Sequence, residues 1–296
     1  MSKRLLFIYN PFSGRKLIRS KLYDIVNIFA EAGYEIEIHP TQSHQDAMRM
    51  ACECADRFDR IVCSGGDGTL DEVVTGVVQS GSKVPIGYIP AGSTNDFGNT
   101  LRIPKDMIKA AKIAVNDDLF ECDYGKLNDS IFVYVAAFGL FTDTSYNTPQ
   151  EMKNFWGHFA YVLEGMKTLH EISSYNMRLE CSERIIQDRF IFGMVTNSAS
   201  VGGFKGITGT DVDLSDGVFE VTLVRTPNNV VELNRIITAL TTKKEDSDLV
   251  FSFKTDKLKC IFDEDVAWTI DGEYAGKNML FDIENVQHGF TILRES

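Results

Sequence analysis

Apolar and polar positions follow two different rhythms along the chain, and the first rhythm covers about 120 residues. Short apolar or alternating runs, typical of strands, occupy residues 5–9, 35–39, 60–63 and 84–89. Between these runs, apolar residues recur at helical spacing over residues 18–32, 47–55 and 70–78. Strands that alternate with helices predict βαβ units and a mostly parallel sheet.

The second rhythm begins after about residue 121. Over residues 123–140 and 174–283, short alternating segments are separated by turn pairs such as Asp271-Gly272, as in antiparallel sheets. Helical spacing returns only within residues 154–170 and 230–242. We therefore predict an α/β domain over residues 1–124 and a β-sandwich domain over residues 125–288. The terminal segment, residues 289–296, carries a last strand that fits either domain.

Charge limits the classes of partner. The chain has 30 Lys and Arg against 42 Asp and Glu, a net charge of −12. A general nucleic-acid binder normally carries a basic surface, so this composition argues against one. The molecule as a whole is repelled by anionic lipid, so any contact with a membrane surface is expected to be local.

The sequence also predicts a cytoplasmic location. The apolar run at residues 5–9 is too short for a signal peptide, and the run at residues 131–141 is too short to cross a bilayer. The six cysteines contain no CxxC pair, which favours reduced thiols in a reducing compartment. Membrane contact, where it occurs, is therefore expected to be peripheral.

The strongest chemical signal is the segment Ser64-Gly65-Gly66-Asp67-Gly68-Thr69, between a predicted strand and a predicted helix. Glycines let the backbone approach a ligand closely, and the start of the helix attracts phosphate. A carboxylate repels an anion, so Asp67 suits a site in which it holds Mg²⁺ or orients a nucleophile. The pattern is neither a P-loop nor GxGxxG. A plain strand-to-helix turn is the structural alternative.

Two further polar loops follow the first and fourth predicted strands. The first, residues 10–16, offers Ser13, Gly14 and the cations Arg15 and Lys16. The second, residues 90–97, offers Gly92, two hydroxyls and the start of a helix. Ligands of open parallel sheets bind beyond the carboxyl ends of the strands. We therefore expect the three loops to converge on one binding site.

These motifs resemble the diacylglycerol kinase catalytic-domain superfamily. The resemblance rests on Asn-Pro-x-Ser-Gly, Gly-Gly-Asp-Gly-Thr-Leu and Pro-Ala-Gly-Ser-Thr-Asn-Asp-Phe in this order, and extends over nearly the whole chain. The chain is most similar to the bacterial soluble lipid kinases, which are related to sphingosine and ceramide kinases. The resemblance implies a Rossmann-like, three-layer domain similar to NAD kinase, a C-terminal β-sandwich, and an active site in the cleft between them.

The resemblance also implies which residues bind ATP. They are Asn10, Ser13, Gly14, Arg15 or Lys16, Thr41, Gly65, Gly66, Gly68, Thr69, Glu72, Gly92, Ser93, Thr94 and Asn95. The chain departs from the family in two places. Arg15 stands where the family often has Lys, so either cation remains a candidate for the phosphate, and Asp71 stands where Asn is common.

Two acidic turns in the β-rich part complete the expected site. Asp213 and Asp216 are three residues apart in a turn, a spacing that suits a hard cation, although a plain Asp-Gly turn is the alternative. The resemblance implies a structural Mg²⁺ on Asp213, Asp216 and the carbonyl of Val218. It also implies a catalytic role for the acidic turn of Asp271 and Glu273, in which Glu273 accepts the proton of the lipid hydroxyl, with Asp67 as the second candidate for the base.

The resulting hypothesis is an ATP-dependent lipid kinase that acts on a diacylglycerol-like lipid at a membrane surface, with Mg²⁺ as cofactor. A sphingoid base, another lipid or a soluble polyol remains an alternative acceptor. A nucleotide-binding regulatory protein without turnover is the alternative from another class. Similar proteins make a homodimer a reasonable expectation.

Overall fold

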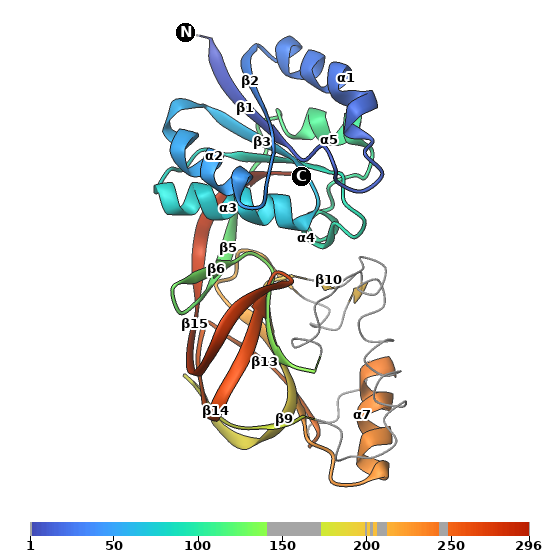
Figure 1. Cartoon of the computed structure of the whole chain (residues 1–296), viewed down its shortest axis with the longest axis vertical. Helices are drawn as coiled ribbons and strands as arrows, with labels where there is room; N and C mark the ends of the chain where they lie inside the picture. Colours follow the sequence, from blue (N-terminus) through green and yellow to red (C-terminus); the bar gives the residue numbers. More distant parts are fainter. Residues whose placement is uncertain are drawn as a thin grey trace. The chain divides into compact units, whose positions relative to one another are not determined.

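The computed structural model of the chain describes residues 2–140, 173–198, 200–201, 204–205, 212–242 and 248–295 (Figure 1). They form two compact units. The first unit contains Met1–Asp123 and His288–Ser296, and the second contains Tyr124–Gln287. The chain leaves the first unit within strand β5 and returns to it within strand β15. The boundary after Asp123 lies where the rhythm of the sequence changes.

A parallel sheet with helices on both faces forms the first unit (Figure 1). Its strands lie in the order β2-β1-β3-β4, and the end of β15 pairs with β4 through Ile292 and Ile86. Helices α1 and α5 pack together on one face, and α2 and α3 on the other. The elements are β1 (Lys3–Tyr9), α1 (Ile18–Glu31), β2 (Tyr34–Pro40), α2 (Asp46–Cys54), the 3₁₀ turn η1 (Ala55–Arg57), β3 (Arg60–Gly65), α3 (Asp67–Ser80), β4 (Ile86–Pro90), α4 (Asp96–Thr100) and α5 (Met107–Ile113).

Burial on both faces explains why the inner strands read as continuous apolar runs. All of Leu5, Leu6, Phe7 and Ile8 in β1 are fully buried, as central strands of a covered parallel sheet require. The ring of Phe7 meets Phe29 of α1 edge-on, with the ring centroids 5.3 Å apart. This packing fixes the layers, and it leaves the loops at the carboxyl ends of the strands to form the site.

Antiparallel strands form the second unit. They lie in the order β13-β12-β9-β7-β14-β15, and β8 also pairs with β9 and β14, so the long strands β9 and β14 flank two short ones. The elements are β5 (Leu119–Leu127), β6 (Ser130–Phe132), β7 (Val135–Gly139), β8 (Tyr175–Cys181), β9 (Ile185–Thr196), β10 (Ser200–Val201), β11 (Phe204–Lys205), β12 (Phe219–Arg225), α7 (Val230–Thr242), β13 (Val250–Thr255), β14 (Lys257–Ile270) and β15 (Glu273–Leu293).

Two apolar clusters stabilise the second unit. In the larger, Trp268 of β14 is buried between Phe138 and Phe281, at centroid distances of 5.0 and 5.1 Å. In the smaller, Ile236 and other residues of α7 pack on Phe192 and its neighbours in β9. Residues of β9 therefore contribute to both clusters: Phe190 and Val195 belong to the larger one, and Phe192 and Met194 to the smaller one.

The structure confirms the strands and helices predicted within residues 5–89 and the helix over residues 230–242. It also confirms the helix start expected within residues 90–97, as α4, and it adds the short helix α5, which was not predicted. The helix predicted within residues 154–170 lies outside the described residues. No helix in the described part of the chain has the length and apolarity that crossing a membrane requires.

Candidate functional site

Backbone hydrogen bonds join the three predicted loops to one another. The N–H of Asn10, directly after β1, donates to the carbonyl of Ser64 at 2.8 Å. The N–H of Ala91, directly after β4, donates to the carbonyl of Gly65 at 2.8 Å. Because β1, β3 and β4 are parallel neighbours, their carboxyl ends meet at one edge of the sheet. The predicted convergence of these loops is present.

The glycines of these loops allow contacts that any side chain would prevent. A Cβ atom on Gly92 would lie 2.6 Å from the Cα of Gly66, and one on Gly14 would overlap the carbonyl oxygen of Ala91. Gly14 also has a φ of +50°, a conformation that favours glycine. A Cβ on Gly65 would overlap the Thr69 hydroxyl. Three glycines, Gly14, Gly65 and Gly92, are thus required by the packing of the loops on one another and on the start of α3.

Gly68 is different, because neither packing nor backbone conformation requires a glycine at this position. It is exposed, it is the second residue of α3, and a Cβ added to it would have no atom within 4 Å. A glycine within a helix costs roughly 0.5–1 kcal/mol of stability relative to alanine. Open space beside an unfavourable glycine is what the close approach of a ligand requires.

We therefore expect Gly68→Ala to separate stability from binding. The variant should be more stable by about 0.5 kcal/mol, because alanine favours the helix. It should bind ATP-Mg²⁺ about tenfold more weakly, because the methyl group occupies the space of the ligand. Urea unfolding and titration calorimetry measure the two effects. Unchanged affinity for ATP would remove Gly68 from the site.

Asp67 lies at the start of α3 and faces the start of α4. Its Oδ2 accepts a hydrogen bond from the Thr94 hydroxyl at 3.2 Å, and its Oδ1 accepts one from the N–H of Phe97 at 3.3 Å. Burial and the nearby charge of Asp96 raise the pKa of Asp67 to about 6, against the opposing effect of these hydrogen bonds. A neighbouring cation would therefore stabilise the ionised form of the Asp67 side chain.

Sequence reasoning missed Tyr88, which connects two of the loops. The buried Tyr88 hydroxyl lies 3.2 Å from both the carbonyl oxygen of Gly65 and the Oδ1 of Asn95. The Asn95 side chain in turn accepts from the N–H of Gly92 at 2.9 Å and donates to its carbonyl at 3.0 Å. Asn95 was predicted to bind the nucleotide; in the structure its side-chain amide closes the loop that carries Ser93 and Thr94.

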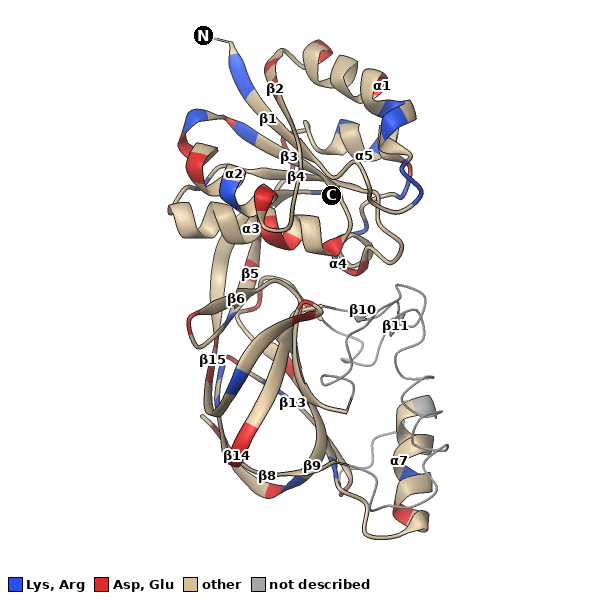
Figure 2. Cartoon of the chain, in the orientation of Figure 1, with Lys and Arg blue, Asp and Glu red and all other residues tan. Residues whose placement is uncertain are grey.

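The loop after β1 supplies the positive charge. The Oδ1 of Asn10 accepts a hydrogen bond from the N–H of Phe12 at 2.9 Å, which fixes the turn before Ser13. Arg15 and Lys16 are exposed, and the Lys16 ammonium lies 5.6 Å from the centroid of the Phe12 ring. Basic residues gather at the start of α1 in an otherwise acidic chain (Figure 2).

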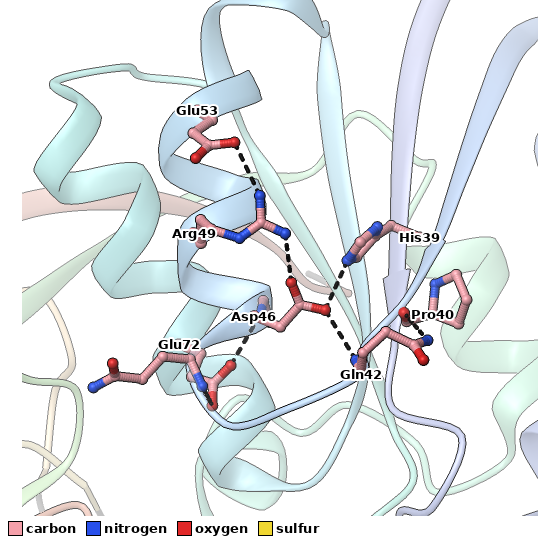
Figure 3. A network of polar contacts seen from close by, with 9 residues as sticks. His39, Pro40, Gln42, Asp46, Arg49, Glu53 and Glu72 are labelled. Atoms are coloured by element: carbon pink, nitrogen blue, oxygen red, sulfur yellow. Dashed lines mark hydrogen bonds and ion pairs between the residues drawn. The ribbon is translucent and has the colours of Figure 1, made fainter.

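Thr41 lies at the same edge of the sheet as the three loops, and Glu72 lies on helix α3. Thr41 follows β2 and is buried, and its N–H donates to the carbonyl of Tyr9 at 2.9 Å. Glu72 lies on α3, and its carboxylate accepts hydrogen bonds from the backbone of Gln45 and Ala47 (Figure 3). Thr41 thus lies next to the loop of Asn10, whereas Glu72 is bonded to the beginning of α2.

In the second unit, Asp271 fixes the turn between β14 and β15. Asp271 and Gly272 have φ angles of +49° and +88°, as an Asp-Gly hairpin turn requires. The Asp271 carboxylate is buried and accepts three backbone hydrogen bonds, from Val133 at 2.6 Å, Tyr134 at 3.1 Å and Val135 at 2.9 Å. Asp271 was predicted to be catalytic; these bonds give its carboxylate a positioning role.

Asp271→Asn is expected to destabilise the protein by about 3 kcal/mol, because an amide donor replaces an oxygen that faces backbone donors. Asparagine tolerates the left-handed backbone as well as aspartate does, so the substitution isolates the carboxylate. Chemical unfolding measures the loss. Asp265→Asn, at an exposed position of β14, is the matched control and should change stability little. Equal stabilities would contradict this role.

Glu273 is the first residue of β15, directly after that turn, and pairs with Ile270 of β14. It is exposed, in contrast to Asp271. The buried carboxylate of Asp271 therefore holds the turn, and the turn presents Glu273 at the surface of the second unit. An exposed carboxylate on a fixed turn is able to accept a proton from a bound hydroxyl.

The turn predicted to bind Mg²⁺ contains carboxylates that already have partners. The Oδ1 of Asp213 accepts from the Ser215 hydroxyl at 2.8 Å, and the Oδ1 of Asp216 accepts from the N–H of Val218 at 3.2 Å. The Lys254 ammonium lies 3.2 Å from Asp216 and 3.2 Å from the buried Glu220. Burial raises the pKa of Glu220 to about 7, although Lys254 opposes this effect.

These oxygen ligands fit a hard cation in chemical type. Lys254, however, already balances the charge of Asp216, so a metal ion there would share this carboxylate with an ammonium group. Over the described residues, no group of three or more His, Cys, Asp or Glu side chains has the arrangement of a metal site. The metal prediction therefore depends on two carboxylates and a carbonyl.

Comparisons with known proteins agree with the architecture and the motifs. Residues 4–127 match the family model of the diacylglycerol kinase catalytic domain. The chain is 35% identical to a diacylglycerol kinase of Bacillus subtilis, over 93% of this chain and 91% of that protein. It is 31% identical to a diacylglycerol kinase of Staphylococcus saprophyticus, over 94% and 91%. A crystal structure of a diacylglycerol kinase from Bacillus anthracis superposes with a TM-score of 0.82 at 25% identity, covering 99% of this chain and 97% of that one.

Proposed function

Since the chain belongs to the diacylglycerol kinase family, and is therefore a lipid kinase, we propose that it transfers the γ-phosphate of ATP to a hydroxyl group of a diacylglycerol-like lipid. The observation that carries this proposal is the direct contact of the three glycine-bearing loops after β1, β3 and β4. Exposed backbone at the start of α3 suits a polyphosphate, because the helix dipole attracts negative charge. With diacylglycerol as the acceptor, the product is phosphatidic acid.

The proposed phosphate site consists of the small and hydroxyl-bearing residues of these loops. Arg15 and Lys16 both stand at this edge and would neutralise phosphate charge, and Thr41 would lie beside the nucleotide. The residues proposed to contact the phosphates are Asn10, Ser13, Gly14, Gly65, Gly66, Gly68, Thr69, Gly92, Ser93 and Thr94.

Asp67 is the proposed ligand for the Mg²⁺ ion that accompanies ATP. Its raised pKa supports this role, because a nearby cation would offset the cost of a buried negative charge. When bound, the ion would neutralise charge that develops on the phosphate oxygens. A second Mg²⁺, held by Asp213, Asp216 and the carbonyl of Val218, would be structural and would order the turn before β12.

Glu273 is the proposed general base. The lipid hydroxyl oxygen attacks the γ-phosphorus of ATP, the bond from that phosphorus to the ADP oxygen breaks, and the hydroxyl proton passes to the Glu273 carboxylate. Phosphoryl transfer depends mainly on positioning and charge stabilisation, so the turn that Asp271 fixes would contribute through placement.

The test is transfer of labelled γ-phosphate from ATP-Mg²⁺ to a panel of acceptors. Mixed micelles of diacylglycerol, micelles of a sphingoid base, and a soluble polyol are assayed in parallel. Label in phosphatidic acid supports the proposal. Label in the phosphorylated sphingoid base or polyol would replace the acceptor and retain the kinase chemistry. Tight binding of ATP without transfer to any acceptor would favour a regulatory protein and contradict the proposal.

A further inference from the structure

The carboxylate of Glu72, on α3, caps the N-terminus of another helix, α2. Helix α2 begins at Asp46, and its N-cap residue Gln45, with a φ of +63°, makes no capping hydrogen bond with its own side chain. Glu72 supplies the acceptors from α3: its Oε1 accepts from the N–H of Gln45 at 2.9 Å, and its Oε2 from the N–H of Ala47 at 3.1 Å (Figure 3). The unsatisfied N–H groups at a helix start need such partners.

Asp46 holds the other end of the same loop. Its Oδ2 accepts from the N–H of Gln42 at 2.9 Å and lies 3.0 Å from the Nε2 of His39, and its Oδ1 accepts from Arg49 at 2.7 Å (Figure 3). Burial alone would raise the pKa of Asp46, but these hydrogen bonds outweigh burial and lower it to about 2. Residues 42–45 are thus held at both ends by carboxylates.

This loop begins at Thr41 and is therefore adjacent to the proposed ATP site. The N–H of Thr41 bonds to Tyr9, the last residue of β1. Glu72 lies on the same helix as Asp67, five residues further along, which is about 7.5 Å along the axis. The helix that starts at the glycine motif therefore also sets the position of the loop after β2.

We propose that Glu72 is a positioning residue of the kinase, which holds the loop over residues 41–45 in the place where Thr41 contacts the nucleotide. This inference rests on the proposed function, since it assigns a role in the same ATP site. It revises the expectation that Glu72 binds the nucleotide itself. The carboxylate acts through the backbone of Gln45 and Ala47, and any loosening of this loop weakens the nucleotide contact.

The test compares Glu72→Ala and Glu72→Gln with Glu53→Gln, an exposed carboxylate of α2 that pairs with Arg49. Amide hydrogen exchange at Gln45 and Ala47 is expected to quicken by about tenfold or more in Glu72→Ala, because both acceptors are lost. The KM for ATP should rise by about tenfold while kcat changes less than threefold. Glu72→Gln, which keeps one acceptor oxygen and remains a test if the alanine variant fails to fold, should lie between. Glu53→Gln should match the original protein.

Three outcomes are distinguishable. Faster exchange together with a raised KM supports the positioning role. A raised KM with unchanged exchange would show that Glu72 is a direct ligand, and faster exchange with unchanged KM would show a purely structural cap; either result overturns the inference. If the original protein transfers no phosphate to any acceptor, the proposed function fails, whereas the exchange measurement still reports on Glu72.

Discussion

Asp67→Asn is expected to lower phosphoryl transfer by about 100-fold or more and to leave the fold intact. The substitution removes the charge that we propose to hold Mg²⁺ but keeps an oxygen able to accept from Thr94 or Phe97. Initial rates with saturating ATP and diacylglycerol measure the loss. Circular dichroism and urea unfolding of the same sample show that the fold persists.

Asp67→Asn is expected to lower activity without lowering the stability of the folded protein. The pKa of Asp67 is about 6 in the folded protein, above its ordinary value of 3.8, so between these values the folded state binds more protons than the unfolded state. Stability therefore falls as pH rises through this window, by about 3 kcal/mol in total. Asp67→Asn removes this decline, and at pH 7.5 without ligands the variant should be at least as stable as the original.

Asp24→Asn is the matched control, because Asp24 is exposed on α1 and bears no role in the site. It should keep full activity and the original dependence of stability on pH. Two results would contradict the role of Asp67. One is near-normal activity of Asp67→Asn, and the other is a loss of stability at pH 7.5 that explains the loss of activity.

Glu273→Gln is expected to lower kcat by ~10²- to 10⁴-fold, the usual contribution of a general base. The affinity for ATP should be unchanged, since Glu273 acts on the acceptor hydroxyl. Glutamine keeps the shape of the side chain but does not take up the proton. Steady-state kinetics with diacylglycerol, together with titration of ATP, separate the two effects.

Glu284→Gln serves as the control, because Glu284 is an exposed residue of the same strand, 3.8 Å from Lys257. It should not change kcat. If Glu273→Gln retains activity while Asp67→Asn abolishes it, the base is Asp67. If Glu273→Gln loses affinity for ATP as well, Glu273 belongs to the nucleotide site.

The sequence predicted the layered unit well because burial there follows simple periodicity. The apolar run of β1 and the apolar face of α1 are both buried in the core, where the ring of Phe7 contacts that of Phe29. Helix α5 was not predicted because it has only seven residues. Local hydrogen bonds stabilise it, since Asp106 caps α5 through the N–H groups of Ile108 and Lys109.

The loops of the site could be predicted from the sequence, whereas the hydrogen-bond partners of individual polar side chains could not. Glycines and hydroxyls after three parallel strands identify a phosphate site without knowledge of distances. In the sequence, a ligand-binding side chain and one that bonds to the backbone look alike. The side-chain oxygens of Asp271, Asn95 and Glu72 accept hydrogen bonds from backbone N–H groups. Asp271 and Val133 are 138 residues apart in sequence, so only the folded chain reveals their contact.

The most direct measurement is transfer from ATP that carries different labels on its α- and γ-phosphates. The protein is incubated with this ATP, Mg²⁺ and mixed micelles of diacylglycerol, and the lipid product is isolated. We expect phosphatidic acid that carries only the γ-label, and its formation should fall at least 100-fold in Asp67→Asn. Absence of label from the lipid, or the same yield in the variant, would contradict the proposed function.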